Sequence, residues 1–566
     1  MKKLSHSLSN RLAMLAVLLA GCTFTASAYD FKVDSICYNI IGENEVEVTQ
    51  NEEYKVSGEV ILPGSVVYDG ITYQVTRIGR YAFGSCKDMT FIAIPEGVTV
   101  ICSFAFSSCS GLQYLELPNS LTTIEFHALL GCSAITEFYV PRNLTDIAYN
   151  AFSSLSSIRY FTCSPLNPKY RAVDGLLYSK DMTTLVAYPP ASPATTFDIP
   201  SNITTLYDYC LHNCDNLTEI TIPESVTVMG MNIFSGCDNI ESIYIPDGVT
   251  SMGVTVFGSC TKLKQVHLPA SADSILSSFF SNCPVLEEVT IPRNIRYIGT
   301  YAFLKCKKLK TVNFEEGSRL NYIDTQAFQD CSAIETFDMP DSVTVLNGQI
   351  FGYCNSLKQI HLSNSLQRMT GATFWYCKAL TELEIPGTIQ FIGNSVLSNC
   401  DALKTLKIGG KDSTPGITYI DECAIMFCDN LEKIEFGANM DSLASYAMDV
   451  PSSVKVFISW ANTPPKMGPS NYVCPGPNAI LYVPRAAQEA YQAHSKWGRF
   501  STIVPIEDVG DVDGDGTVSI SDVTALIDYL LDNENEIAAP LADVDLDGNV
   551  SISDVTELID NLLQGS

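Results

Sequence analysis

The chain has 566 residues, 46% of them apolar, which is enough to bury a large core and excludes a disordered protein. Its formal net charge is −29 at pH 7, and residues 508–566 hold fifteen Asp or Glu with no Lys or Arg. Because phosphate binding requires clustered cations, this charge argues against nucleic acid as a partner.

Residues 1–28 are predicted to be an export signal. They combine a basic start, a short apolar run near residues 12–20 and small residues after it. Two cleavage sites remain open, since Leu19-Ala20-Gly21-Cys22 resembles a lipoprotein lipobox and Ala26-Ser27-Ala28 suits ordinary signal peptidase. Both place the mature chain at the cell surface or outside the cell. No later segment has 18 uninterrupted apolar residues, so we expect membrane attachment only through a lipid anchor.

Cysteine and proline mark a repeat of 23 residues through most of the chain. Thirteen of the twenty cysteines occupy one position of this repeat: Cys86, Cys109, Cys132, Cys214, Cys237, Cys260, Cys283, Cys306, Cys331, Cys354, Cys377, Cys400 and Cys428. A proline precedes the cysteine by fourteen residues in most copies, as Pro223 precedes Cys237. Two markers on one period indicate a repeat architecture.

One copy, LTEITIPESVTVMGMNIFSGCDN from Leu217, shows how a coil would fold. Ile220 and Ile222 point inward from a short strand while Glu219 and Thr221 point out. A proline ends the strand, a second extended stretch follows, and a short helical turn reaches Cys237. One coil cannot bury its own apolar edge, so copies must stack. The prediction is a solenoid of about fourteen coils, each adding ~4.8 Å along a parallel β-sheet.

The recurring pattern I-P-x-x-V-T-x-I-x-x-x-A-F-x-x-C resembles the BspA-like class of bacterial leucine-rich repeat proteins over residues 72–450. The resemblance implies a leucine-rich repeat solenoid with a parallel β-sheet and short helical turns. It also implies flanking elements: a β-rich N-terminal cap at residues 29–71, a hairpin insert near residues 163–199 and a C-terminal cap at residues 451–507. The family further implies a bacterial surface or secreted adhesion protein.

The cysteines are expected to be buried thiols rather than disulfides. Cysteines in register on neighbouring coils would have parallel Cβ atoms ~4.8 Å apart, and this distance is longer than the usual Cβ–Cβ distance of ~3.8 Å in a disulfide. Buried thiols of this kind pack as small apolar side chains. Any local disulfide would come from the off-register residues, whose pairing stays open: Cys22, Cys37, Cys102, Cys163, Cys210, Cys423 and Cys474. Converging C-x-x-C pairs, which a zinc site requires, do not occur.

Outward positions of the predicted strands form a column of polar and aromatic side chains that suits a large ligand, either an extracellular protein or a glycan. The candidate ligand-face residues are Tyr114, Glu116, Tyr139, Tyr244, His267 and His361. No histidine lies in a known catalytic motif, and carboxylate pairs such as Glu382 and Glu384 stand on an open sheet without a cleft. We therefore expect no catalytic residue, and a protein that is not an enzyme.

The tail, residues 508–566, repeats one acidic loop: DVDGDGTVSISD and then DVDLDGNVSISD. Alternate oxygens of such a loop wrap a hard cation, and a central glycine permits the sharp turn. The predicted ligands are Asp511, Asp513, Asp515, Thr517, Ser519 and Asp522 in the first loop, and Asp543, Asp545, Asp547, Asn549, Ser551 and Asp554 in the second. The tail is thus expected to bind two calcium ions.

An amphipathic helix is predicted after each loop, with Val523, Leu526, Ile527 and Leu530 on one apolar face of the first. This duplicated loop and helix resembles a type I dockerin, a small α-helical domain that calcium folds and that binds a cohesin domain. The positions that usually carry recognition in that family are Ile520, Ser521, Ile552 and Ser553 here. They differ from the Ser-Thr pair common in cellulosomal dockerins, which puts a cellulosomal partner in doubt.

The sequence therefore predicts an exported, non-catalytic binding protein, with an adhesive solenoid and a calcium-dependent module that docks to a cohesin-like partner. The alternative is a component, catalytic or not, of an extracellular polysaccharide-degrading assembly, because dockerins frequently accompany carbohydrate-active proteins.

Overall fold

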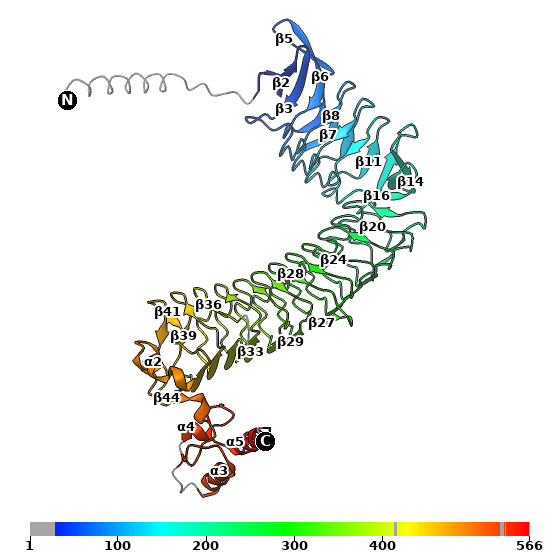
Figure 1. The fold of residues 1–566 in the computed structure, drawn as a ribbon. Coiled ribbons are helices and arrows are strands. Elements are labelled where there is room, and N and C mark those ends of the chain that lie inside the picture. Colours follow the sequence, from blue (N-terminus) through cyan, green and yellow to red (C-terminus); the bar gives the residue numbers. More distant parts are fainter. Residues whose placement is uncertain (1–28, 412–415, 533–536, 538, 565–566) are drawn as a thin grey trace, which may run out of the picture. The chain divides into compact units, whose positions relative to one another are not determined.

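A computed structural model describes residues 29–411, 416–532, 537 and 539–564. The predicted signal peptide and lipobox lie outside the described residues. The chain divides into two compact units, residues 1–193 and 194–566. Each consists largely of stacked coils (Figure 1).

The N-terminal unit begins with an antiparallel β-sheet that passes into the coils. In it β1 (Phe31–Val33), β2 (Ile36–Gly42) and β3 (Glu45–Thr49) run antiparallel, β3 then pairs in parallel with β6 (Ile71–Ile78), and β5 (Ser65–Tyr68) pairs with β6. The coils contribute a first set of strands: β4 (Gly58–Ile61), β7 (Met89–Ala93), β9 (Tyr114–Glu116), β11 (Glu137–Val140) and β13 (Tyr160–Cys163). The second set is β8 (Val100–Ile101), β10 (Thr123–Ile124) and β12 (Asp146–Ile147), which extends from β6.

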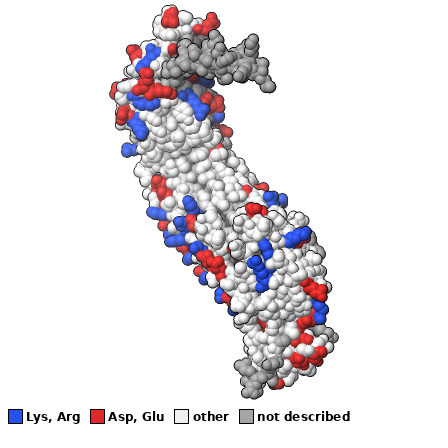
Figure 2. Space-filling view, turned by 90° about the vertical axis from the view of Figure 1, so that its left-hand side faces the viewer, with Lys and Arg blue, Asp and Glu red and all other residues white. Residues whose placement is uncertain are grey.

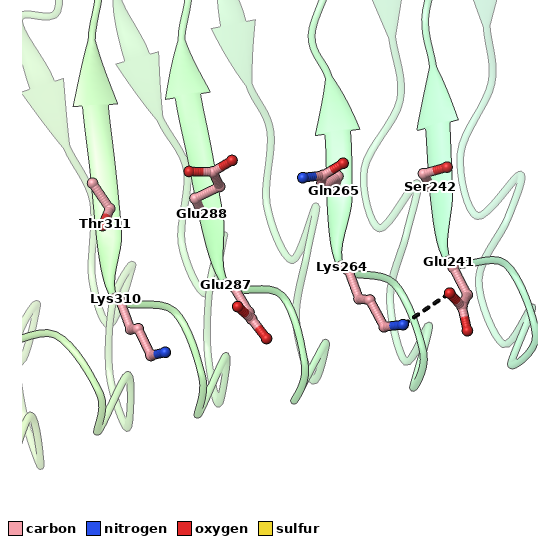
Figure 3. A pocket seen from close by; sticks show the side chains of 8 residues that line it. All are labelled: Glu241, Ser242, Lys264, Gln265, Glu287, Glu288, Lys310 and Thr311. Carbon is pink, nitrogen blue, oxygen red and sulfur yellow. Dashed lines mark hydrogen bonds and ion pairs between the residues drawn. The ribbon is translucent and has the colours of Figure 1, made fainter.

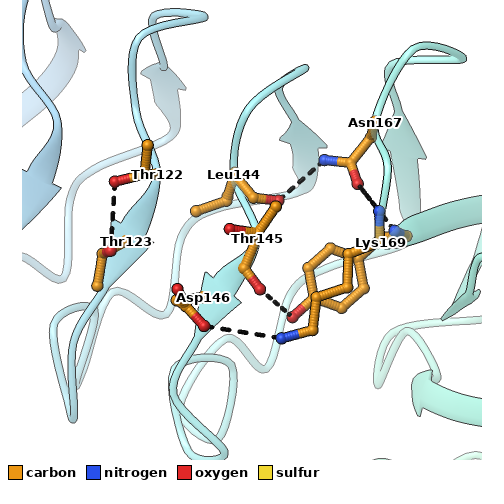
Figure 4. A network of polar contacts seen from close by, with 8 residues as sticks. Thr122, Thr123, Leu144, Thr145, Asp146, Asn167 and Lys169 are labelled. Carbon is orange, nitrogen blue, oxygen red and sulfur yellow. Dashed lines mark hydrogen bonds and ion pairs between the residues drawn. The ribbon is translucent and has the colours of Figure 1, made fainter.

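An antiparallel insert follows β13 and comprises β14 (Tyr170–Val173), β15 (Leu176–Ser179) and β16 (Thr184–Ala187). Asn167 anchors its start: the amide nitrogen donates to the carbonyls of Leu144 (2.9 Å) (Figure 4) and Pro141 (2.8 Å). The amide oxygen accepts from the backbone N–H of Tyr170 (2.8 Å). The insert is thereby fixed to the preceding coil.

In the described part of the C-terminal unit most coils have a longer and a shorter strand, and the strands that pair between neighbouring coils run parallel. The longer strands are β17 (Thr196–Asp198), β19 (Glu219–Thr221), β21 (Ser242–Tyr244), β23 (Gln265–His267), β25 (Glu288–Ile291), β27 (Thr311–Phe314), β29 (Thr336–Asp338), β31 (Gln359–His361), β33 (Glu382–Ile385), β35 (Thr405–Ile408), β37 (Lys433–Phe436), β40 (Val456–Ser459), β43 (Ile480–Val483) and β44 (Thr502–Pro505). The shorter ones are β18 (Thr205–Leu206), β20 (Val228–Met229), β22 (Ser251–Met252), β24 (Ser274–Ile275), β26 (Tyr297–Ile298), β28 (Tyr322–Ile323), β30 (Val345–Leu346), β32 (Arg368–Met369), β34 (Phe391–Ile392), β36 (Tyr419–Ile420), β38 (Ser442–Leu443) and β41 (Lys466–Met467).

The fold class predicted from the repeat is confirmed, and the solenoid has about 18 turns rather than fourteen. The additional turns include coils beyond residue 450, where the recurring pattern ends. In particular β40, β43 and β44 continue the parallel pairing of β37 past residue 450. Another parallel pair, β39 (Asp449–Val450) with β42 (Tyr472–Val473), lies in the same region.

Each coil buries residues from all its segments. In the coil from Leu217, the side chains of Ile220, Met229 and Phe234 are buried, while the flanks of Ile220 are exposed. The turn before Cys237 is closed by a hydrogen bond from its N–H to the Phe234 carbonyl (3.0 Å). Phenylalanines of neighbouring coils stack, as Phe257 does on Phe280 with ring centroids 5.5 Å apart.

The cysteine ladder has a specific role in this core. Most thiols at the repeat position donate to a backbone carbonyl of the preceding coil, as Cys283 does to Phe257 (3.0 Å) and Cys306 to Phe280 (3.1 Å). A cysteine is therefore both a small apolar side chain and a weak donor to a buried acceptor. All described cysteines are free thiols, and burial raises the pKa of Cys283 well above its ordinary value, which makes it unreactive.

The turns before the cysteines use left-handed backbone at two positions in most coils. In one coil these are Asn232 (φ 54°) and Gly236 (φ 74°), and in the next they are Thr255 (φ 56°) and Ser259 (φ 61°). Such conformations cost a non-glycine residue about 1 kcal/mol or more. The stacking of neighbouring coils offsets that cost.

The last coils and the tail supply the helices. The coils contain η1 (Arg485–Ala487), α2 (Gln488–Ala493) and η2 (Trp497–Arg499), with Tyr491 and Trp497 fully buried. The tail contains η3 (Ile506–Asp508), α3 (Ile520–Asp532), α4 (Ala539–Ala542) and α5 (Ile552–Gln564). Its small core consists of Val512, Val523, Leu526, Ala542, Val544, Val555 and Leu558.

Candidate metal loops and binding faces

The first acidic loop brings together three of its predicted ligands. Carboxylate oxygens of Asp511, Asp513 and Asp522 lie within 4.8 Å of one another. Asp522, in the first turn of α3, is fully buried, and its Oδ1 accepts hydrogen bonds from the N–H groups of Val512 (2.7 Å) and Asp513 (3.0 Å). The helix thus holds a carboxylate against the start of the loop.

Asp511 shows that this cluster fits a cation. Its Oδ2 accepts from the N–H of Gly516 (2.9 Å), while its Oδ1 is buried without a hydrogen-bond partner among the described residues. A buried carboxylate oxygen without a donor is costly unless a cation compensates it. Gly516 has φ +90°, which permits the sharp turn of the loop. Oxygen donors of this kind suit calcium.

The second loop is similar, although here Asp543 Oδ1 accepts a hydrogen bond from the Asp547 N–H (2.9 Å). Asp543, Asp545 and Asp554 form the corresponding group, and Asp554 Oδ1 accepts from the N–H groups of Val544 (2.6 Å) and Asp545 (3.2 Å). Burial, reinforced by the neighbouring carboxylates, raises the pKa of Asp543 to about 7 even though the Gly548 N–H lowers it. A divalent cation would favour the charged form of this group.

The other predicted ligands lie outside these two groups. Asp515 is exposed and accepts from the N–H (2.8 Å) and hydroxyl (2.7 Å) of Thr517. The Ser519 hydroxyl lies 2.7 Å from that of Ser521. The second loop repeats the pattern, with Asp547 accepting from both nitrogens of Asn549 and the Ser551 hydroxyl 2.7 Å from that of Ser553. Their role as ligands stays a prediction.

Both tail helices expose an apolar stripe beside the acidic loops. Ile520 and Ile552 are each 72% exposed, as expected for recognition positions. The apolar face predicted for α3 is divided in the structure: Val523, Leu526 and Leu530 take the inward positions, whereas Ile527 is exposed. Ile559 is exposed at the corresponding place of α5. The exact duplication of the stripe is a signal in the sequence, since its members recur 32 residues apart.

The sheet face of the N-terminal unit alternates tyrosine and glutamate. Tyr114, Tyr139 and Tyr160 point outward and are about half exposed, at 51%, 45% and 44%. Glu137 stands beside Tyr160 in register and accepts a hydrogen bond from its hydroxyl. Tyr114, Glu116, Glu137 and Tyr139 contribute to a shallow hollow of about 590 Å³, whose lining residues include no Lys or Arg.

The sheet face of the C-terminal unit instead alternates opposite charges. Just before the longer strands, successive coils place Glu241, Lys264, Glu287, Lys310, Glu335 and Lys358. Lys264 pairs with Glu241 at 2.8 Å (Figure 3), and Lys358 pairs with Glu335 at 2.8 Å. The first four line a hollow of about 500 Å³. In the face seen in Figure 2, basic and acidic side chains interleave rather than separate.

Family comparisons agree with this architecture. The model of the BspA type leucine rich repeat region matches in 6 copies, over residues 70–169, 191–310, 273–404 and 321–455, which is more than half of the chain. The chain belongs to this family. The model of the dockerin type I domain matches residues 509–563. No curated protein matches the chain.

Solved structures similar to this BspA-type protein include leucine-rich repeat proteins from Eubacterium ventriosum (24% identity, 56% of this chain and 92% of the other, TM-score 0.45) and Bacteroides ovatus (21%, 84% and 100%, TM-score 0.43). A leucine rich cell surface protein from Faecalibacterium prausnitzii is also similar (21%, 58% and 94%, TM-score 0.36).

The two families indicate the broad activity, location and partners to expect of this BspA-type protein. Both are typically non-catalytic and usually extracellular or surface-associated, and type I dockerin domains bind calcium and imply a cohesin partner. Within the described ranges, every helix is too short or too polar to cross a membrane.

The remaining candidate ligand-face residues lie in the C-terminal unit. Tyr244 and His267 stack with ring centroids 4.5 Å apart, and His267 Nε2 lies 3.6 Å from Asp247. His361 is exposed at the end of β31. His267 and His361 therefore remain candidate ligand-face residues of the C-terminal unit in this BspA-type protein.

Proposed function

We propose that the protein is an exported, non-catalytic adhesion protein whose solenoid binds an extracellular protein or glycan and whose dockerin attaches it to a cohesin-like partner. The observation that carries the docking role is the duplicated stripe of Ile520 and Ile552, exposed beside two acidic clusters of equal geometry. Exposed isoleucines at equivalent places of both helices offer a partner two related apolar faces.

The dockerin is proposed to bind two calcium ions, one in each loop. The buried, donor-free oxygen of Asp511 and the burial of Asp543 support this occupancy. Isothermal titration of the full chain with calcium should give two sites, and Asp511→Ala or Asp543→Ala should each remove one. Unchanged stoichiometry in both variants would contradict the assignment.

Cohesin docking is tested by capture of the full chain on immobilised cohesin domains, with calcium and with chelator. We expect capture only with calcium, and at least tenfold weaker binding after Ile520→Asp combined with Ile552→Asp. Ile61→Asp is the matched control, because Ile61 is an exposed isoleucine of the N-terminal unit. Equal loss in the control would show that the effect is not specific to the stripe.

The tyrosine face of the N-terminal unit is the proposed ligand site of the solenoid. Half-exposed tyrosines provide apolar ring faces with a polar tip, and the neighbouring carboxylates accept hydrogen bonds from hydroxyl or amide donors. Screening the full chain on arrays of neutral and acidic glycans and of extracellular proteins should give ligands that carry no strong negative charge. Selection of polyanions alone would contradict this site.

Membership of a polysaccharide-degrading assembly is the second candidate, since the dockerin itself favours it. Incubating the protein with a panel of polysaccharides distinguishes a binding subunit from an enzyme: we expect binding without release of reducing sugar. Export is tested by fractionating native cells, with the protein expected in the envelope or medium, and labelling with a fatty acid distinguishes the lipobox from ordinary cleavage.

A further inference from the structure

The outward face of the solenoid changes character at its last three longer strands. In β37 the outward positions hold Lys433 and Glu435. In register with them, β40 places Val456 and Ile458, and these outward residues are as buried as inward ones. β43 continues the apolar rows with Ile480 and Tyr482, and β44 adds Val504. An apolar outward face that is buried requires a cover.

The dockerin supplies this cover. Val456, Ile458, Tyr482 and Val504 form one buried cluster, against which Leu541 and Leu546 of the tail pack together with Ile506 and Val509. Two polar contacts frame the cluster: the Tyr482 hydroxyl donates to the Pro540 carbonyl (2.8 Å), and Lys433 Nζ donates to the Asp545 carbonyl (3.3 Å).

The two acidic loops differ at the point of contact. The fourth position is Gly514 in the first loop and Leu546 in the second, the loop that lies on the solenoid. Around Gly516 there is open space, whereas a Cβ on its counterpart Gly548 would lie 3.1 Å from Lys455 and 3.3 Å from Val456. The second loop is therefore seated closely on the sheet, and a larger residue at position 548 would displace it.

We propose that the second calcium loop and the last coils form one cooperative unit, so that calcium in this loop stabilises β40, β43 and β44. The proposal rests on the proposed calcium occupancy and adds a coupling to it. Any ligand that favours the seated loop must favour the strands beneath it, and the effect is reciprocal. The first loop lies outside this cluster, and the helix stripes at Ile520 and Ile552 stay exposed for a partner.

Hydrogen–deuterium exchange of the full chain tests the coupling. With calcium, peptides covering β43 and β44 should exchange at least tenfold more slowly than with chelator. Leu546→Asp should abolish that protection while α3 keeps its own response to calcium. Leu531→Asp is the matched control, because Leu531 is a 75% exposed leucine of α3.

The outcomes separate coupling from occupancy. Calcium protection of both loops with no change in β43 of the wild type overturns the coupling alone. No response in either loop overturns the calcium sites and the coupling with them. Protection of β43 that persists in Leu546→Asp also overturns the coupling.

A second variant acts from the solenoid side, in case Leu546→Asp fails to fold. Tyr482→Phe removes only the hydroxyl that reaches Pro540. By reciprocity, it should weaken one of the two calcium sites by roughly two- to fivefold in a titration and leave the other unchanged. Two unchanged sites, or two equally weakened ones, contradict the coupling.

Discussion

The sheet faces of the two units share one repeat and differ in what they present. Residues 91–162 present tyrosines beside glutamates, whereas residues 241–358 present glutamates and lysines in alternation. In the second case the charges pair between neighbouring coils. Because Glu241, Lys264, Glu335 and Lys358 already have partners, they help to hold the coils in register and offer less to a ligand than the tyrosine face does.

The interiors of the two units do not show this difference. Phe106 stacks on Phe83 with centroids 5.3 Å apart, and Phe280 stacks on Phe303 at 5.2 Å. The thiols of Cys109 and Cys283 donate to equivalent carbonyls, each at 3.0 Å. The inward positions therefore specify the solenoid, and the outward positions are free to specialise.

The largest expected effect tests the equality of the interiors. Phe106→Ala and Phe280→Ala should each lower the free energy of unfolding of their unit by about 3–5 kcal/mol, because both rings are fully buried and leave a cavity. Hydrogen exchange of the flanking strands measures each unit by itself. If the loss in free energy of unfolding in one unit were less than half that in the other, the two interiors would not be equivalent.

The repeat makes the interior of the solenoid predictable from the amino-acid sequence. The 23-residue spacing of cysteine and proline determines which residues stack, and Ile220, Met229 and Phe234 are buried as the pattern requires. The donation of most repeat thiols to a carbonyl of the previous coil is not predictable, since it depends on side-chain geometry. The predicted number of coils is too low, because the stacking continues past residue 450 in coils that do not repeat the full pattern.

Prediction is less complete in the tail. The carboxylates at positions 1, 3 and 12 of both loops meet as their spacing suggests, because a loop followed by a helix brings them together. Leu546 is a sequence hint of contact with the solenoid, as an apolar residue where the first loop has glycine. The contact itself cannot be predicted from Leu546 alone. It depends on the apolar outward residues of β40 and β43, which are seen to form one surface only when the two strands are placed in register.

The second largest effect concerns ligand affinity, which should depend on the tyrosine face and not on the charged face. Tyr114→Ala combined with Tyr139→Ala should weaken the ligand selected in the array screen by at least about 30-fold, since clustered tyrosines commonly dominate a binding surface. The matched pair Glu241→Ala and Lys264→Ala should leave that affinity within about twofold. Surface plasmon resonance measures both. Equal losses of affinity in the two double variants would show that the ligand does not bind specifically to the tyrosine face.

Pairing between coils in the C-terminal unit extends to its shorter strands. Asp324 accepts from the Tyr297 hydroxyl (2.7 Å) and from the Asn347 amide (2.7 Å). Burial acts to raise the pKa of Asp324, but these hydrogen bonds and the Thr325 N–H lower it to about 2. The stabilisation is therefore present above the ordinary pKa, near 4, and is lost as the pH falls through about 2.

Asp324→Asn should accordingly cost roughly 1–2 kcal/mol at pH 7, with allowance for partial exposure, and progressively less between pH 4 and pH 2. Urea unfolding followed at several pH values gives this difference. A cost that stays constant with pH would mean that the amide disturbs packing rather than the charge on Asp324.

The smallest effect concerns the charge ladder itself. Lys264→Glu would place three acidic residues in adjacent coils, with Glu241 on one side and Glu287 on the other. Because the groups are exposed, the expected cost is only about 1 kcal/mol, and it should shrink at high salt as the charges are screened. Thr136→Glu is the matched control, since Thr136 precedes its strand in the N-terminal unit in the same way, and Arg159 follows it in the next coil. A salt-independent cost, or an equal cost in the control, would show that the alternation of charge does not hold the C-terminal coils in register.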